Sequence, residues 1–468
     1  MTAATLLGRT LALLGFLIGA RAITDNSFLT HLATGRLILT TGSVPSVDPY
    51  SVFGAGEAWT VQSWLVSVVY AALEQGPGLW SIRVFHGAIT ATVTLGLWRL
   101  SEPARQLVTR VMLVSLALLI GTFLWPPRPL LIGLLGMVVV LLVLERRLDR
   151  RLLVPLFWVW VNSHGSFVLG AGLVGLVFLG STIDRRRVDR DDVIPVLYAA
   201  AGCLAGMVGP LGWRVLWFPL HMMGRSEALE RVSEWASPSF RSPVEQLYLL
   251  PLALLVVAAT RGAPWRTLLP SLVFFVAGLL AVRNLGLATI VIVALVAPSL
   301  AGLIGTVTGE RRVIGARLAT AAIVALAAVV VVATVAEEPL DLGDYPVAMA
   351  DWMDDRSLLA DAGVRVAQRD YVGNYLIHRK GAQAQVFMDD RFDFHALDVI
   401  EDHNTMLLGG DIDAVMARRD FDVVLWGTEG PLARWLVARD DWVVVESDED
   451  WLIACRRDRP AFTRCTTR

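Results

Sequence analysis

Long apolar runs recur along the chain as far as about residue 335, and they constrain its fold more than any other feature. Eleven runs can be separated, at positions 6–23, 79–97, 107–124, 130–144, 152–161, 166–180, 193–208, 247–259, 268–282, 285–304 and 318–335. A helix needs about 20 apolar residues to cross a bilayer, so the shorter runs must be tilted, extended or half-buried. The pattern predicts a polytopic α-helical membrane protein with about eleven transmembrane helices.

The arginines between these runs predict the orientation of the chain. If the N-terminus is cytoplasmic, arginines cluster in the inner loops at 99–110, 146–151, 185–190, 261–266 and 311–317, whereas the short outer loops hold only Arg128 and Arg283. Loops rich in arginine and lysine remain on the cytoplasmic side. An odd number of crossings then places the C-terminus outside. Two long segments, 24–78 and 209–246, also become outer loops.

Charge separates the chain into two parts. Residues 1–334 hold 26 basic and 16 acidic residues, whereas the remainder holds 15 basic and 27 acidic residues. We therefore expect a membrane domain at 1–336 and an extracytoplasmic α/β domain at 337–468. In this tail, the patterns predict helices at 345–359 and 411–419 and strands at 385–388, 422–426, 442–446 and 451–455. Cys455 and Cys465 are either a disulfide or two thiols.

The first outer loop carries the most informative polar residues. Amphipathic stretches at 28–39 and 61–73 are expected to lie along the membrane surface. Asp25 stands immediately before the first stretch, at the boundary of the first apolar run. Its position suits a base at the membrane surface, and it also suits the N-cap of the following helix. Asp48 precedes Pro49, which is typical of a turn.

Several short sequences resemble bacterial polytopic glycosyltransferases of the GT-C fold, relatives of protein mannosyltransferases and oligosaccharyltransferases. In the first outer loop these are DNSFLTHLATG at 25–35, PSVDPYS at 45–51 and WTVQSWL at 59–65. Further along they are WVNSHGSF at 160–167, GPLGWR at 209–214, SEW at 233–235, VRN at 282–284, YVGNYL at 371–376 and DDR at 389–391. The ordered set, which covers nearly the whole chain, carries the resemblance.

The resemblance implies a specific reaction. Such enzymes transfer a sugar from a polyprenyl-phosphate-linked donor on the outer face, usually with inversion, and an acidic residue of the first outer loop is the base. Asp25 is then the catalytic residue. The family often has a second acidic residue where this chain has Ser27, so we expect no essential metal or other cofactor. The acceptor is a glycan, a glycolipid or a protein side chain. Membrane lipids are the other partners, and nucleic acid is not expected.

Other polar residues on the predicted outer face are candidates for binding the lipid phosphate or the substrates. Arginine is suited to phosphate because its planar guanidinium donates several hydrogen bonds, although a snorkelling arginine at the interface gives the same pattern. The candidates are His31, Arg128, Asn162, His164, Arg214, Glu234 and Arg283. In the tail, Asp389, Asp390 and Arg391 are more typical of a solvated turn than of a binding site.

A glycosyltransferase is not the only class that this pattern allows. A lipid or polysaccharide transporter and a non-catalytic protein of cell-envelope assembly are the alternatives. Transporters tend to contain internal repeats and ionisable residues at mid-membrane. No repeat is evident here, and the polar residues gather on the predicted outer face, which favours the enzyme.

Overall fold

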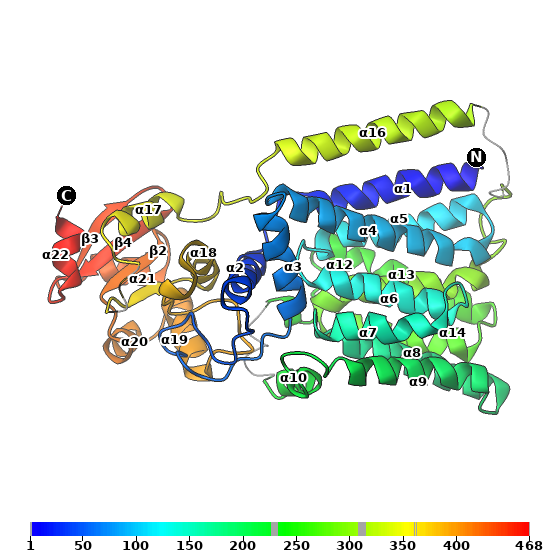
Figure 1. Ribbon diagram of the computed structural model, residues 1–468, viewed down its shortest axis with the longest axis horizontal. Coiled ribbons are helices and arrows are strands. Elements are labelled where there is room, and N and C mark those ends of the chain that lie inside the picture. The colour runs from blue at the N-terminus through cyan, green and yellow to red at the C-terminus, as the bar shows by residue number, and fades with distance from the viewer. Residues whose placement is uncertain (1, 226–232, 308–314, 360, 362, 468) are drawn as a thin grey trace. The chain divides into compact units, whose positions relative to one another are not determined.

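The computed structural model describes residues 2–225, 233–307, 315–359, 361 and 363–467 (Figure 1). Its contacts divide the chain into two compact units. Unit 1 consists of Met1–Ile23, Leu73–Gly224 and Glu230–Leu340, and unit 2 of Thr24–Ala72, Arg225–Leu229 and Asp341–Arg468. Most of the first outer loop therefore packs in the same unit as the tail.

Unit 1 is a helical bundle, and each of the eleven apolar runs coincides with one of its helices. The helices are α1 (Ala3–Ala20), α4 (Trp80–Leu100), α5 (Leu107–Leu124), α6 (Leu130–Leu144), α7 (Leu153–Val161), α8 (Phe167–Arg185), α9 (Arg190–Ala205), α13 (Leu249–Thr260), α14 (Trp265–Leu280), α15 (Leu285–Val296) and α16 (Ala316–Ala336). Two shorter helices, α10 (Arg214–Met223) and α12 (Pro243–Leu247), lie in the second long outer loop.

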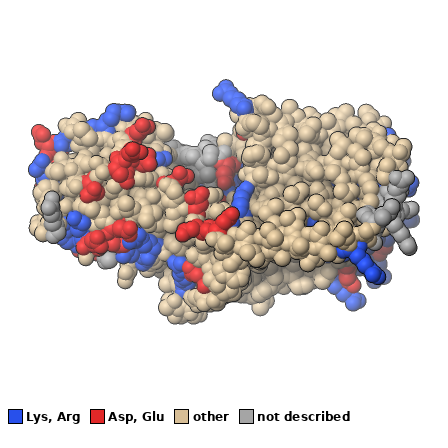
Figure 2. Space-filling model, turned by 90° about the horizontal axis from the view of Figure 1, so that it is seen from above, with Lys and Arg blue, Asp and Glu red and all other residues tan. Residues whose placement is uncertain are grey.

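Six helical segments within the described residues are long and apolar enough to cross a membrane. They are Ala3–Ala20, Leu107–Leu124, Phe167–Arg185, Pro243–Thr260, Val282–Leu300 and Ala316–Ala336. Figure 2 shows that the visible face of unit 1 is almost without charged side chains between its two ends. The chain is therefore a multi-pass membrane protein, and the larger number of eleven crossings stays a prediction.

Glycines on α1 allow close packing against α4. A Cβ atom at Gly15 would stand 2.2 Å from the Thr94 hydroxyl oxygen, and one at Gly19 would stand 2.6 Å from the His86 carbonyl oxygen. Lipid gives apolar surfaces little reason to associate, so membrane helices gain stability where small residues let their backbones approach.

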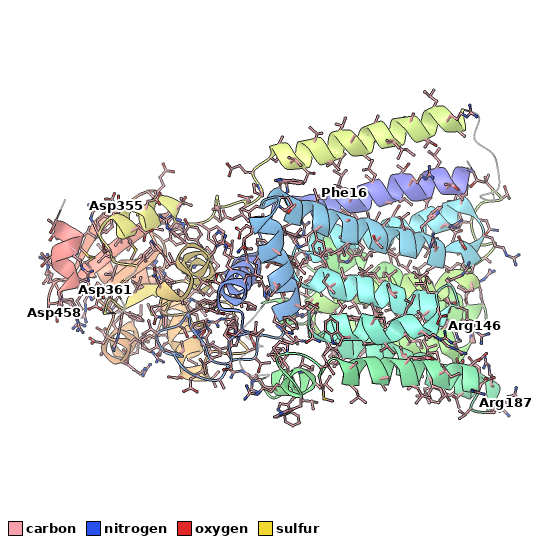
Figure 3. All side chains as sticks on the ribbon, in the orientation of Figure 1. Phe16, Arg146, Arg187, Asp355, Asp361 and Asp458 are labelled. Atoms are coloured by element: carbon pink, nitrogen blue, oxygen red, sulfur yellow. A yellow bond between two sulfur atoms is a disulfide. The ribbon has the colours of Figure 1, made fainter. Side chains whose placement is uncertain are left out.

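Arg83 joins the ends of α1 and α16 where the chain leaves unit 1. Its buried guanidinium donates to the carbonyl oxygens of Ala20 and Thr334, and the Ile23 amide bonds the Pro339 carbonyl. The segments that follow α1 and α16 therefore lie side by side at this end of the bundle. Arg146 and Arg187 lie at the opposite end of the bundle (Figure 3). This separation is the one that the arginine pattern predicts.

Unit 2 contains a four-stranded mixed sheet in the order β1-β2-β4-β3. The strands are β1 (Val366–Gln368), β2 (Val423–Gly427), β3 (Trp442–Ser447) and β4 (Trp451–Arg456), and only β1 and β2 are parallel. The helices of the tail are α17 (Val347–Asp355), α18 (Asp370–Lys380), α19 (Leu397–Leu408), α20 (Ile412–Arg419), α21 (Pro431–Val437) and α22 (Ala461–Thr466). Three of the four predicted strands are confirmed, and Cys455 and Cys465 form a disulfide.

The predicted strand at 385–388 is wrong, because this segment pairs with the first outer loop instead of the sheet. The Val386 amide bonds the Tyr50 carbonyl at 2.8 Å, and the Val52 amide bonds the Val386 carbonyl at 2.9 Å. Phe53 adds its ring to the tail core, 5.8 Å from the ring of Phe387. An apolar run is buried in either arrangement, so its pattern does not distinguish them.

The two amphipathic stretches are helices α2 (Asn26–Thr41) and α3 (Trp64–Gln75). Within unit 2, α2 packs against α18, and it approaches α3 so closely that a Cβ atom at Gly35 would stand 1.9 Å from the Ser67 carbonyl oxygen. This packing buries Phe28, Leu29 and Leu32. It accounts for the apolar face of α2 without a membrane surface.

Candidate functional site

Asp25 occupies the N-cap position of α2, but its side chain makes no capping hydrogen bond. The carboxylate is partly buried, and its Oδ1 atom is shielded from solvent. Burial, followed by the negative charge of Asp25, raises the pKa of both Tyr70 and Tyr345, so the carboxylate lies near these two phenols. A capping role would explain why an aspartate stands at the start of α2. It does not explain a carboxylate that makes no hydrogen bond to the first amides of the helix.

Asp390 reaches the same place from the tail. The Ser27 hydroxyl donates to Asp390 Oδ2 at 2.5 Å, and the Asn26 amide donates to the same oxygen at 3.3 Å. Although Ser27 stabilises the carboxylate, burial and the charges of Asp389 and Asp25 raise the pKa of Asp390 to about 7. The tail thus places a carboxyl group against Ser27, which is the position where the resembling family often has a second acidic residue.

Asn374 on α18 holds the Asp390 backbone. Its Oδ1 atom accepts from the Asp390 amide at 3.3 Å and from the Thr30 hydroxyl at 3.0 Å. Residues separated by more than 300 positions in the sequence therefore form one cluster, which we call the acidic cluster: Asp25, Asn26, Ser27, Tyr345, Asn374 and Asp390. Carboxyl, amide, hydroxyl and phenol groups of this kind are suited to a ligand rich in hydroxyl groups.

The expectation that Asp389, Asp390 and Arg391 form a solvated turn is wrong. Asp389 is fully buried, and Arg391 is 7% exposed. Arg391 donates to both oxygens of Asp389, at 2.8 and 2.6 Å, and to Asp48 Oδ1 at 2.6 Å. Although burial opposes ionisation, Arg391 and His395 hold the pKa of Asp389 well below its usual range. The buried apolar residues just before this triplet were the signal that could have revealed its burial.

The turn role predicted for Asp48 is confirmed, and Asp48 also forms an ion pair. Its carboxylate accepts from the Tyr50 and Ser51 amides, at 3.3 and 2.9 Å, while it also pairs with Arg391. The guanidinium of Arg391 lies over the Trp59 ring, 4.5 Å from its centroid. The outer loop and the tail are therefore joined by a buried charge network.

His31 lies on α2, partly buried, with its Nδ1 atom 3.4 Å from the Ser67 hydroxyl on α3. Its described contact is thus within the outer loop. Whether it also binds a substrate stays a prediction.

A second cluster lies in unit 1, where three predicted residues come together. Arg128 donates to both oxygens of Glu234, at 2.8 and 2.6 Å, and Arg283 lies over the Trp235 ring, 4.4 Å from its centroid. Although burial opposes ionisation, the charges of Arg128 and Arg283 lower the pKa of Glu234. We call this group the arginine cluster. Its two cations and one anion leave a net positive charge.

Arg231, which stands three residues before Glu234 and could pair with it, lies outside the described residues. Among the described residues, no carboxylate forms an ion pair with Arg283. A partly buried guanidinium with an aromatic ring as its main contact is suited to an anionic ligand such as a phosphate.

Three predicted residues of unit 1 remain, Asn162, His164 and Arg214. Asn162 is fully buried and its amide donates to the carbonyl oxygens of Trp158 and Gly206, at 2.9 and 3.1 Å, which holds the turn after α7. His164 Nδ1 accepts from the Ser166 amide at 3.2 Å in the same turn. Arg214 begins α10 and is exposed. These contacts are structural, and the binding roles of the three residues stay predictions.

Within the described ranges, no three histidine, cysteine, aspartate or glutamate side chains form a group that could hold a metal ion. Comparison of the chain with models of known protein families, and with curated proteins, finds no match.

Proposed function

We propose that the protein is a membrane glycosyltransferase that moves a sugar from a polyprenyl-phosphate-linked donor to an acceptor on the extracytoplasmic face. The observation that carries this proposal is the acidic cluster, in which the Asp25 carboxylate makes no capping hydrogen bond, its charge acts on Asp390 and Tyr345, and Asp390 accepts from Asn26 and Ser27. Its chemistry fits a base for a hydroxyl group. The resemblance of the sequence to GT-C enzymes supports the same role.

The proposed reaction forms a bond between the acceptor oxygen and the anomeric carbon of the sugar. As this bond forms, the bond from the anomeric carbon to the phosphate oxygen breaks, and its electron pair stays on the departing phosphate. Asp25 accepts the proton of the acceptor hydroxyl. Base catalysis of this kind contributes about 100- to 10,000-fold to the rate.

The arginine cluster is suited to the donor phosphate. The phosphate gains negative charge as the sugar leaves, and fixed cations stabilise that charge in the transition state. Arg283 is the proposed phosphate ligand, because Arg128 already pairs with Glu234. The arginine pattern supports an outer-face reaction, since Arg146 and Arg187 lie at one end of unit 1 and residues 23 and 339 pair at the other end. The tail disulfide is consistent with an oxidising compartment outside the cytoplasm.

The test is transfer from radiolabelled polyprenyl-phosphate hexoses and pentoses into envelope material, with membranes that contain the wild-type chain or a variant. Asp25→Asn should lower transfer by about 100-fold or more while membrane insertion is unchanged. Asp355→Asn is the matched control, because Asp355 is an exposed aspartate of the same unit. Normal transfer by Asp25→Asn would remove Asp25 as the base. No transfer by the wild type from any donor would overturn the proposal and favour a transporter or an assembly protein.

A further inference from the structure

Asp390 belongs to the tail, yet its carboxylate is held by the first outer loop. Both side-chain donors to it, Asn26 and Ser27, follow Asp25 directly in the sequence, and both reach the same oxygen, Oδ2. Asp390 is thus held against the two residues that follow Asp25, and the negative charge of Asp25 acts on it.

Asp389 and Asp390 are adjacent in the sequence, but their carboxyl groups have opposite electrostatic surroundings. Asp389 is paired with Arg391 and contacts His395, whereas no arginine, lysine or histidine among the described residues pairs with Asp390. The charged and titratable groups that face Asp390 are Asp389 in its own loop, Asp25 before α2 and Asp370 at the start of α18, and Tyr345 lies close by. Asp390 is partly buried, and a carboxyl group withdrawn from water whose charged neighbours are all carboxylates is costly to ionise.

Asn374 supplies a second observation, which points to a ligand. Its side chain is fully buried, and its Oδ1 atom accepts from the Asp390 amide, so the orientation of the amide group is set. Its Nδ2 atom then has no acceptor among the described residues. An unpaired buried donor costs about 1–3 kcal/mol, so a ligand oxygen that accepts from it would recover that cost.

We propose that Asp390 holds a proton that it shares with Asp25, so that the two carboxyl groups act as one pair with a single negative charge. This role rests on the proposed function of Asp25 as base. Asp390 is a positioning residue, because it acts through Asp25. Two full charges side by side would repel each other and the anionic donor, whereas one shared proton leaves a single base.

The proton balance of this pair is simple. When the acceptor oxygen bonds to the anomeric carbon, its proton passes to the Asp25 carboxylate and the phosphate leaves with its electron pair. The pair then holds two protons. Release of one proton to solvent restores the starting state with a single negative charge.

Infrared difference spectroscopy of the full chain in lipid nanodiscs tests this sharing. The pH is varied over about two units on either side of neutrality, and the C=O stretch of protonated carboxyl groups is followed. Asp390→Asn should remove one titrating band. Asp25→Asn should lower the midpoint of that band by about one pH unit, because a negative neighbour is lost. Asp25→Ser repeats the test if the first variant does not fold.

Asp393→Asn is the matched control. Asp393 lies in the same loop and burial also raises its pKa, but Asp25 is not among the charges that act on it. This variant should lose its own band and leave the shift caused by Asp25→Asn unchanged. An unchanged midpoint in Asp25→Asn, or a titrating band that persists in Asp390→Asn, would overturn the shared proton.

Kinetics separate this inference from the proposed function. If the wild type transfers sugar, its kcat/KM should fall as Asp390 ionises above neutral pH, and Asp390→Asn should abolish that fall. A purely structural role would not remove one limb of the pH profile. Transfer without coupled titration would refute the shared proton alone, and coupled titration without transfer would refute the glycosyltransferase alone.

Discussion

Arg391 is the residue on which the joining of the outer loop and the tail most depends. It compensates two buried carboxylates, Asp48 and Asp389, which are 3% and 0% exposed. Arg391→Leu keeps some apolar volume and leaves both carboxylates buried without their main cation. Removal of one partner from a buried ion pair costs about 3–5 kcal/mol, so unit 2 should lose that much stability at neutral pH.

Hydrogen exchange of the full chain in nanodiscs, followed by mass spectrometry, measures this loss locally. Each 1.36 kcal/mol is tenfold, so amides around residues 48–59 and 386–395 should exchange about 100- to 1,000-fold faster or more. Arg439→Leu is the matched control, because Arg439 and Asp413 form an exposed pair. Exposed pairs contribute about 0–1 kcal/mol, so exchange should change by less than about tenfold.

The stability that Arg391→Leu loses should depend on pH in a defined direction. Arg391 depresses the pKa of Asp389 in the folded wild type, so the pairing stabilises the fold above the usual aspartate pKa and is lost as pH falls towards the depressed value. In Arg391→Leu, only His395 still opposes the effect of burial on Asp389, so the carboxyl group should take up a proton at a higher pH than in the wild type. The difference between variant and wild type should then shrink as pH is lowered. Exchange within a few-fold of wild type at neutral pH would refute the reasoning.

Two further predictions concern orientation and the donor site. Reporter fusions after Gly78 and at the C-terminus should both report an external location, and a cytoplasmic C-terminus would contradict the orientation. Arg283→Gln should raise the KM for a polyprenyl-phosphate sugar by about tenfold or more, since hydrogen bonds to charged groups contribute roughly 1.5–3 kcal/mol. Arg241→Gln, which changes an exposed arginine that is not among the candidates, should alter the KM by less than about threefold, and the reverse order would exclude Arg283 as the phosphate ligand.

Much of the membrane part could be predicted from sequence because its signals are local. Each apolar run must satisfy its own backbone in lipid, and an α-helix does so within the segment. Helices therefore stand at every predicted run. The arginines of the predicted inner loops include Arg146 and Arg187, which lie at one end of unit 1. Helices α2 and α3 and three strands of the tail could be predicted for the same reason, since the hydrophobic period and the turn residues that mark them extend over only a few positions.

The candidate site was only half predictable. Asp25 could be selected from its place at the end of an apolar run, and Arg128, Glu234 and Arg283 from their outer-face positions. Nothing local indicates that Asp390 meets Ser27, that Arg391 meets Asp48, or that residues 386–388 pair with the outer loop. Each of these contacts joins segments more than 300 residues apart. The sequence by itself determined where the apolar helices of unit 1 form and which of the stretches between them carry the arginines. Only the tertiary structure decided that the tail completes the acidic cluster, because long-range packing and burial, not local pattern, bring Asp390 against the residues that follow Asp25.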